Sequence, residues 1–290
     1  LLYYLASKRR LKSYWGDVRR GVWMLLAKIS MEKIASLPPE DKKSWRPNIL
    51  VFSGVPKRRW YLIDFAAAIS SNRGFLTVAN IIKSSPNIGS KLDEFSQIIK
   101  DFLEKQKVSA ISKSFIAPEI ISGMKFFVSS YGFGSICPNT IIIGSLADDN
   151  KLNDYIKFLF FLSQSKKNVI ILNYPRNKNN EDQGYAIENF LGEGSTNISI
   201  WWGRQKRNAG LSLALSYLIM QNKSWQDTSL SLKSVVKDRD DIPSAQQVID
   251  TLIKESNIEA KTQVYYESSN NIEDVFTRIL SESKSSDLTF

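Results

Sequence analysis

The residues best placed to do chemistry in this chain are charged side chains that follow apolar stretches. In "SGVPKRR", Ser53 and Gly54 end an apolar run, and Lys57, Arg58 and Arg59 precede a helical pattern. Basic residues near a helix N-terminus can bind an anion, because backbone N–H groups there lack partners within the helix. The loop has a single glycine and neither a Walker nor a dinucleotide-binding pattern. A plain strand–helix turn with solvated charges therefore remains the simpler interpretation.

An acidic pair, Asp148 and Asp149, follows another apolar run in "GSLADDN". Two adjacent aspartates could bind a cation, or they could stabilise the first turn of the next helix, which is the interpretation we favour. Their negative charge also disfavours a phosphate, which needs backbone N–H groups and cations. We therefore expect no metal ion, no cofactor and at most weak ATP binding.

The composition disfavours catalysis. The chain has no histidine and one cysteine, Cys137. These counts exclude Ser-His-Asp triads, imidazole metal ligands, internal disulfides and thiolate zinc sites. Carboxylate or lysine chemistry remains open, but no such residues form an active-site pattern. We expect a protein that is not an enzyme.

Aromatic residues and cations alternate near Trp201 and Trp202, which precede Arg204, Lys206 and Arg207. Such a pattern can stack nucleic-acid bases. However, successive strand residues point to opposite faces, so the two indoles cannot share one stacking surface. We expect one in the core and the other at an interface.

The positive charge is concentrated at the start of the chain. Residues 1–60 contain 14 Lys and Arg and 4 Asp and Glu, so the net charge of +10 lies entirely in this segment. The segment could bind nucleic acid, lie beside an anionic membrane surface, or be a solvated helix face. Nucleic-acid binding has no other support in the sequence, and we expect none.

Continuous apolar strands alternate with helical patterns, which predicts an α/β fold with two parallel-rich sheets flanked by helices. The strands are expected at residues 48–54, 74–83, 108–117, 139–145, 168–174, 197–203, 227–236 and 259–268. Helices are expected at residues 60–71, 91–106, 118–130, 151–165, 209–221, 243–256 and 272–283. The right-handed crossover rule predicts the order 3-2-1-4-5 for the first five strands. We expect residues 284–290 to be frayed.

Another helix is expected at residues 17–36, with a stripe that needs a partner: Val18, Val22, Leu25, Leu26 and Ile29. The polar stretch 175–184 is typical of a linker. We therefore divide the chain into a basic segment with its connecting helix (1–44), a first α/β subdomain (45–180) and a second (181–290).

Read in order, several motifs resemble the cytoplasmic C-terminal domain of the cation-chloride cotransporter family. They are "WGDVRRG", "SWRPNILVFSGVP", "GFGSICPNTIIIG", "KKNVIILNY" and "ISIWWGRQKRNAGLSLALSYLI". The motif residues are Trp45, Arg46, Pro47, Gly54, Gly132, Gly134, Pro138, Asn139, Gly144, Trp201, Trp202, Gly210 and Leu211. The compactness of the chain suits a prokaryotic member.

The resemblance implies a regulatory, dimer-forming domain on the cytoplasmic side of the membrane, attached to a membrane domain that carries sodium, potassium and chloride electroneutrally. Residues 17–36 would then be a juxtamembrane helix. The preceding basic residues would lie near the lipid surface: Lys8, Arg9, Arg10 and Lys12. Self-association would use the stripe of that helix, the two tryptophans or the helix at 209–220. The first half also resembles the universal stress protein fold, which leaves an ATP-sensing module as the alternative.

Overall fold

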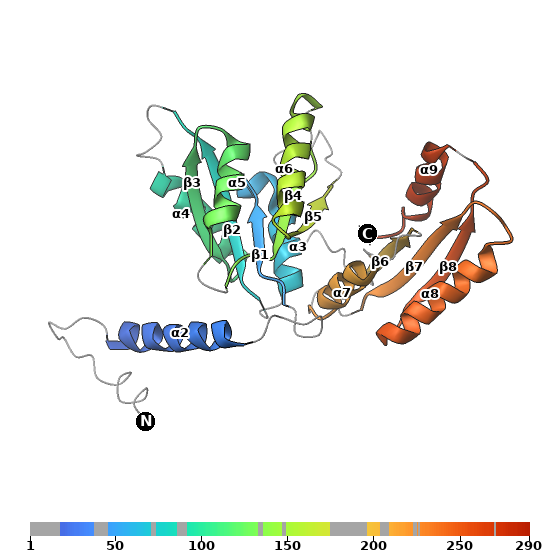
Figure 1. Cartoon of the computed structure of the whole chain (residues 1–290), viewed down its shortest axis with the longest axis horizontal. Helices are drawn as coiled ribbons and strands as arrows, with labels where there is room; N and C mark the ends of the chain where they lie inside the picture. Colours follow the sequence, from blue (N-terminus) through green and yellow to red (C-terminus); the bar gives the residue numbers. More distant parts are fainter. Residues whose placement is uncertain are drawn as a thin grey trace.

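The computed structural model describes residues 18–37, 46–70, 74–85, 92–132, 136–146, 149–174, 196–203, 209–222, 225, 227–269 and 271–290. Within these ranges the chain forms two parallel sheets flanked by helices, which confirms the predicted fold class (Figure 1). No helix in the described ranges is both long and apolar enough to cross a membrane.

The first sheet has five parallel strands in the predicted order, β3-β2-β1-β4-β5. The strands are β1 (Ile49–Phe52), β2 (Leu76–Lys83), β3 (Ile111–Ala117), β4 (Thr140–Gly144) and β5 (Asn168–Leu172). Between them lie η1 (Pro56–Arg58), α3 (Trp60–Ser70), α4 (Leu92–Lys105), α5 (Ile120–Ser130), η3 (Asp149–Lys151) and α6 (Leu152–Gln164). Helix α5 begins at Ile120 and not at the predicted Pro118, because the backbone of Glu119 is extended.

Both faces of the first sheet are buried, which explains its continuous apolar strands. In β1, Ile49 and Val51 pack on one face, with α3 and α4. Leu50 and Phe52 pack on the opposite face, with α5 and α6. Every residue of β1 is therefore in the core, as the alternation of side chains along a strand requires.

The second sheet has four parallel strands in the order β8-β7-β6-β9. The strands are β6 (Asn197–Trp202), β7 (Ser229–Val236), β8 (Lys261–Tyr266) and β9 (Leu288–Thr289). The helices are α7 (Ala209–Met220), α8 (Ile242–Ser256) and α9 (Ile272–Glu282).

The C-terminal residues are not frayed, contrary to our expectation. Leu288 and Thr289 pair in parallel with β6. The main chain of Phe290 bonds to both Ser199 and Trp201, and its ring packs against Phe65 of α3. A two-residue strand is too short to give a periodic signal in the sequence. Its structure is determined by the strand it pairs with, and not by its own composition.

The two sheets share one hydrophobic core. The cluster that contains Ile49 and Val51 of β1 also contains Ile198 and Ile200 of β6. Helices α3 and α7 are in contact, and Figure 1 shows them between the two sheets. The same cluster contains Leu213 of α7 and Ile249 of α8. Helices α7 and α8 therefore cover the inner face of the second sheet.

The outer face of the second sheet is covered differently. Trp201, Lys233 and Tyr265 of three neighbouring strands contact α9 there. Among the described helices, α9 alone covers this face, whereas α5 and α6 together cover the outer face of the first sheet. The second sheet is thus the less completely covered of the two.

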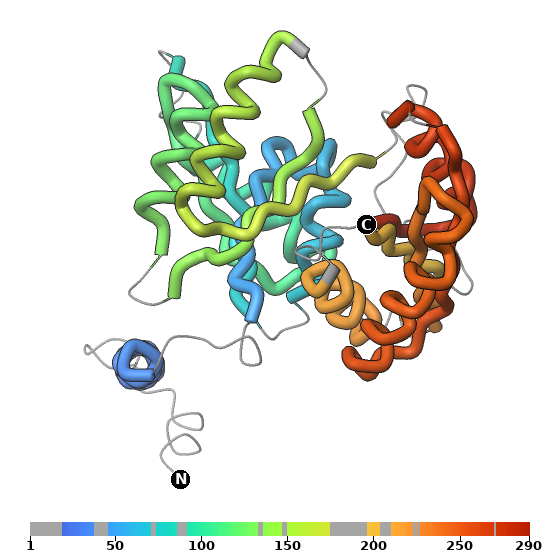
Figure 2. Tube along the Cα trace, turned by 45° about the vertical axis from the view of Figure 1, so that its right-hand side comes forward, coloured from blue at the N-terminus to red at the C-terminus, as the bar shows by residue number. Residues whose placement is uncertain are grey.

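The N-terminal helix α2 (Val18–Ser36) forms close to the expected range. Figure 2 shows it standing apart from the two sheets, and its apolar side chains are exposed. These are Val22, Trp23, Met24, Leu25, Leu26, Ile29 and Ile34. They lie all round the helix, which is typical of a helix that is buried on more than one side.

Candidate functional site

Ligands of parallel α/β sheets bind at the carboxyl ends of the strands, and in the first sheet that edge includes the basic loop after β1. Gly54 has a φ of 61°, in the left-handed region, and the chain then forms η1. The N–H of Arg58 donates to Val55 at 3.0 Å, and the N–H of Arg59 donates to Pro56 at 3.3 Å. In a phosphate cradle these two N–H groups would have to point towards the anion. Here they donate hydrogen bonds within the turn instead.

Side chains cover the end of β4, next to this loop. A Cβ atom placed on Gly144 would lie 3.1 Å from the Tyr61 hydroxyl and 3.7 Å from the Arg59 guanidinium. The Tyr155 hydroxyl donates to the Gly144 carbonyl at 3.1 Å. Burial raises the pKa of Tyr155, and the Arg59 charge partly opposes this effect. Of the acidic pair, Asp149 opens η3 before α6, and Asp148 lies outside the described residues.

The Asn139 side chain joins the amino ends of β1 and β4. Its Oδ1 accepts hydrogen bonds from the Asn48 N–H at 3.0 Å and the Thr140 hydroxyl at 2.8 Å. Its Nδ2 donates to the Arg46 carbonyl at 2.7 Å. Two motif segments that are far apart in sequence are thus joined by one amide, which gives Arg46 and Asn139 a role in strand alignment.

The two motif prolines are buried at the same edge of the sheet. The Pro47 carbonyl approaches Gly74 so closely that a Cβ atom there would lie 2.0 Å from the oxygen. The Pro138 carbonyl accepts a hydrogen bond from Lys167 Nζ at 2.7 Å. Trp45 lies outside the described residues.

Gly132 closes the turn before β4. Its φ is 139°, and a Cβ atom would lie 2.6 Å from the Cys137 sulfur. Only glycine combines this backbone with this close approach. Gly134 lies outside the described residues, as do Lys8, Arg9, Arg10 and Lys12.

The two tryptophans of β6 lie on opposite faces of the second sheet. Trp202 packs against the shared core. Trp201 lies beneath α9, where its Nε1 donates to the Ser283 hydroxyl at 2.7 Å. Gly210 is in the first turn of α7, and Leu211 packs against the shared core. Much of the surface that we expected at an interface between copies is therefore packed against other parts of the same chain.

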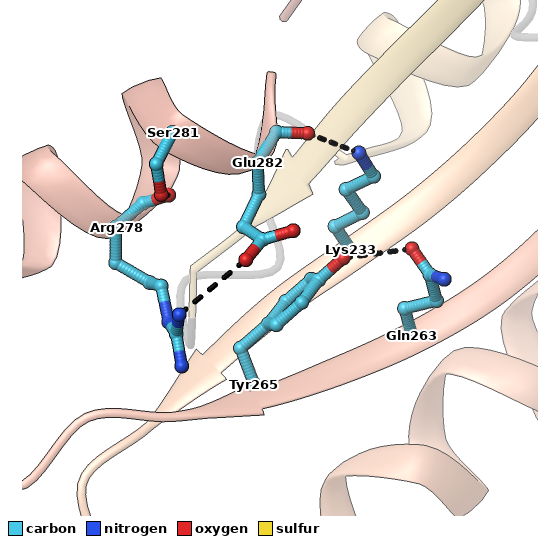
Figure 3. Close-up of polar contacts among 6 residues, drawn as sticks. All are labelled: Lys233, Gln263, Tyr265, Arg278, Ser281 and Glu282. Carbon is cyan, nitrogen blue, oxygen red and sulfur yellow. Dashed lines mark hydrogen bonds and ion pairs between the residues drawn. The ribbon is translucent and has the colours of Figure 1, made fainter. Parts of the chain in front are cut away.

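A polar cluster, which we call the α9 seat, holds the last helix on the sheet: Lys233, Gln263, Tyr265, Arg278 and Glu282 (Figure 3). Lys233 is only 6% exposed, and its Nζ donates to the Glu282 carbonyl at 2.6 Å. Its charge lies at the negative end of the helix dipole. Lys233 Nζ also lies 5.7 Å from the centre of the Trp201 ring.

The remaining contacts of the seat lie within α9, within β8 and between the two. The Arg278 guanidinium forms an ion pair with Glu282 at 3.4 Å and lies 5.8 Å from the Tyr265 ring centre. The Tyr265 hydroxyl donates to Gln263 Oε1 at 2.9 Å. Burial, and then the Glu282 carboxylate, raises the pKa of Tyr265. These contacts explain how a helix with no fully buried side chain stays on the sheet.

A cavity of about 450 Å³ lies at the carboxyl ends of β6 and β7, beside the start of α8. Trp202, Val236, Val248 and Ile249 line it with apolar surface. The Ser234 hydroxyl at its wall already donates to the Trp202 carbonyl at 2.9 Å. Asp241 and Ser244 also line the cavity, and the Ser244 hydroxyl already donates to the Asp241 carbonyl at 2.9 Å. A specific ligand site usually adds a few convergent polar groups to an apolar surface, whereas both of these hydroxyls are used within the chain.

One partly buried acid, Asp64, lies in the apolar helix α3. Burial raises the pKa of Asp64 from its ordinary value of 3.8 to about 7. Asp64 was not among the candidate residues predicted from the sequence, although its lone carboxyl in the apolar stretch "WYLIDFAAAIS" was an available signal.

The chain is thus a parallel α/β domain in which side chains cover the carboxyl end of β4 in the first sheet. Among the described residues, no group of three or more Cys, Asp and Glu side chains could hold a metal ion. Residues 59–176 match the model of solute carrier family 12.

Two solved structures are among those that match this chain. The cytoplasmic domain of a prokaryotic cation chloride cotransporter is similar with a TM-score of 0.53 and 18% identity, over 77% of this chain and 80% of that one. A universal stress protein from Archaeoglobus fulgidus DSM 4304 has a TM-score of 0.46 and 12% identity, over 83% and 85% of the two chains.

These findings confirm the resemblance to the cation-chloride cotransporter family. The family match includes the motif residues Gly132, Pro138, Asn139 and Gly144. The likeness to the solved cytoplasmic domain concerns the fold, because the identity is low.

Proposed function

We propose that this chain is the cytoplasmic domain of an electroneutral cation-chloride cotransporter and that it regulates transport by an attached membrane domain. The match of residues 59–176 to solute carrier family 12 carries this proposal. The two-sheet fold, similar to a cytoplasmic domain of a prokaryotic cotransporter, supports it. In this role the chain is not an enzyme, and sodium, potassium and chloride are cargo of the membrane domain.

The proposal places the chain on the cytoplasmic side of the cell membrane. Residues 1–44 would connect it to the membrane, with Lys8, Arg9, Arg10 and Lys12 near anionic headgroups. The subdomains would be residues 45–180 and 181–290; both of their boundaries, 44/45 and 180/181, lie outside the described residues. The exposed apolar side chains of α2 support a helix that is covered in the whole protein.

We also propose that the domain forms a homodimer and binds no nucleic acid. Two copies tethered in one bilayer have a high effective concentration, so a weak contact between cytoplasmic domains can suffice.

The alternative, an ATP-sensing module, has less support. In the loop after β1 the N–H groups of Arg58 and Arg59 bond within the turn. The Tyr61 hydroxyl and the Arg59 side chain lie over Gly144, at the end of the neighbouring strand.

The exposed thiol of Cys137 provides a test of the proposed location. The complete protein, with the chain in its natural context, should be found in the membrane fraction. A membrane-impermeant maleimide should label Cys137 in inside-out vesicles and not in intact cells, and Cys137→Ser should abolish that labelling. Labelling of Cys137 in intact cells, or a complete protein without membrane helices, would contradict the proposal.

A further inference from the structure

Among the described helices, one covers the outer face of the second sheet. Parallel sheets are normally covered on both faces. In the first sheet two helices, α5 and α6, share the outer face. In the second sheet α9 is the only described helix on that face, above Trp201, Lys233 and Tyr265.

Helix α9 leaves most of its apolar surface exposed. Ile272, Phe276 and Leu280 are 67%, 56% and 68% exposed. They recur every four residues and therefore form one stripe. The seat beneath the helix is largely polar, and no side chain of α9 is fully buried. The apolar stripe is thus free to contact another surface.

The stripe is symmetric about its central residue. Phe276 lies midway between Ile272 and Leu280. An antiparallel copy of α9 would therefore place Ile272 of each copy opposite Leu280 of the other, with the two Phe276 side chains at the centre. The charges at the helix ends also match in this arrangement. Glu273 and Asp274 lie in the first turn, and Lys284 follows the last turn. The last turn itself contains Glu282, whose carboxylate pairs with Arg278. An antiparallel pair therefore brings Glu273 and Asp274 of each helix towards Lys284 of the other.

We propose that α9 packs antiparallel against α9 of a second copy, around a two-fold axis at Phe276. Such a contact uses the same patch on both copies. Each copy would also add a second helix to the outer face of the other, where the described residues provide one. This inference rests on the homodimer part of the proposed function and identifies its contact.

Helix α6 carries a similar stripe, Leu152, Ile156 and Phe160. In that stripe the aromatic residue is at one end, so in an antiparallel pair of α6 helices Phe160 would lie opposite Leu152 and not opposite another Phe160. The outer face of the first sheet already has two helices, and α6 is anchored by the buried Phe158 and Leu162. Phe160, which is 67% exposed, is therefore a matched control for Phe276.

The size of the stripe predicts a weak dimer. Its three side chains expose on the order of 400 Å² per copy, which is typical of a functional patch on a monomer. A standard stable interface buries about 800 Å² per partner. The isolated chain should therefore dimerise with a micromolar or weaker Kd.

Cross-linking tests the contact directly. In a Cys137→Ser background, the 290-residue chain would carry either Phe276→Cys or Phe160→Cys and react with a bismaleimide. Packed helix axes lie about 8–10 Å apart, so a reagent of similar span can join two residues at the axis. Phe276→Cys should give a cross-linked dimer whose yield rises with concentration, and Phe160→Cys should give almost none.

Sedimentation provides a second measurement. Phe276→Asp should weaken dimerisation at least about tenfold, and Phe160→Asp should leave it unchanged, with circular dichroism to verify folding of both variants. A dimer unaffected by Phe276→Asp, or one lost through Leu25→Asp in α2, would overturn the α9 contact and leave the homodimer proposal standing. A chain that remains monomeric to millimolar concentration would contradict both.

Discussion

Replacing Asp64 by Asn should stabilise the protein, and the gain should depend on pH. The amide has nearly the same shape as the carboxyl but cannot ionise. Burial raises the folded-state pKa of Asp64 to about 7, from 3.8. The folded protein therefore holds a proton between these values that the unfolded chain releases.

The direction of the effect follows from linkage. Because the folded state binds more protons in this window, the contribution of Asp64 to stability is fully present below pH 3.8 and is lost as the pH rises to about 7. Each pKa unit corresponds to about 1.4 kcal/mol, so the loss approaches about 4 kcal/mol above pH 7. The Asp64→Asn variant escapes this loss.

Urea unfolding followed by tryptophan fluorescence, at several pH values between 4 and 8, measures the difference. The variant should match the natural protein near pH 4 and exceed its stability by up to about 4 kcal/mol at pH 8. Asp154→Asn is the control, because Asp154 is exposed on α6 and forms only a surface ion pair with Lys157. An Asp64→Asn variant that is less stable at pH 8, or a difference that does not vary with pH, would refute the reasoning.

Three other predictions concern the motif residues and ATP binding. Asn139→Ala should lower the free energy of unfolding by about 1–3 kcal/mol, because the Asn48 N–H and the Arg46 carbonyl, just before β1, lose their side-chain partner. Asn173→Ala, at an exposed site, should cost less in the same denaturation assay. Gly132→Ala should destabilise by at least about 1 kcal/mol because of its backbone and the contact with Cys137, whereas Gly203→Ala, with open space around it, should have little effect on the melting temperature. Calorimetry should detect no ATP binding at micromolar concentrations, and tight binding abolished by changes in residues 144–150 would favour the nucleotide-sensing alternative.

The first sheet could be predicted from the sequence because its strands are continuous apolar runs between periodic helices. Strand order then followed from a general handedness rule. The short strand β9 could not be predicted in this way. Leu288 and Thr289 are a strand because Ile198 and Ser199, distant in sequence, offer an unpaired edge.

The α9 seat was also missed, because three separate elements bring its members together. Lys233 interrupts a strand of otherwise apolar and small residues, and that irregularity was the available signal. Its partner, the carbonyl of Glu282, leaves no trace in the sequence. The motif residue Asn139 was found by resemblance, but its role in joining β1 and β4 required the structure.

Ion uptake by the complete protein tests the central proposal most directly. Rubidium uptake into proteoliposomes that contain the parent protein would be measured with external chloride or gluconate, at several membrane potentials. We expect uptake to require chloride, to be independent of membrane potential, and to change in rate when residues 46–290 are deleted. Uptake that proceeds equally in gluconate would contradict cation-chloride cotransport, and an unchanged rate after the deletion would contradict a regulatory role for this domain.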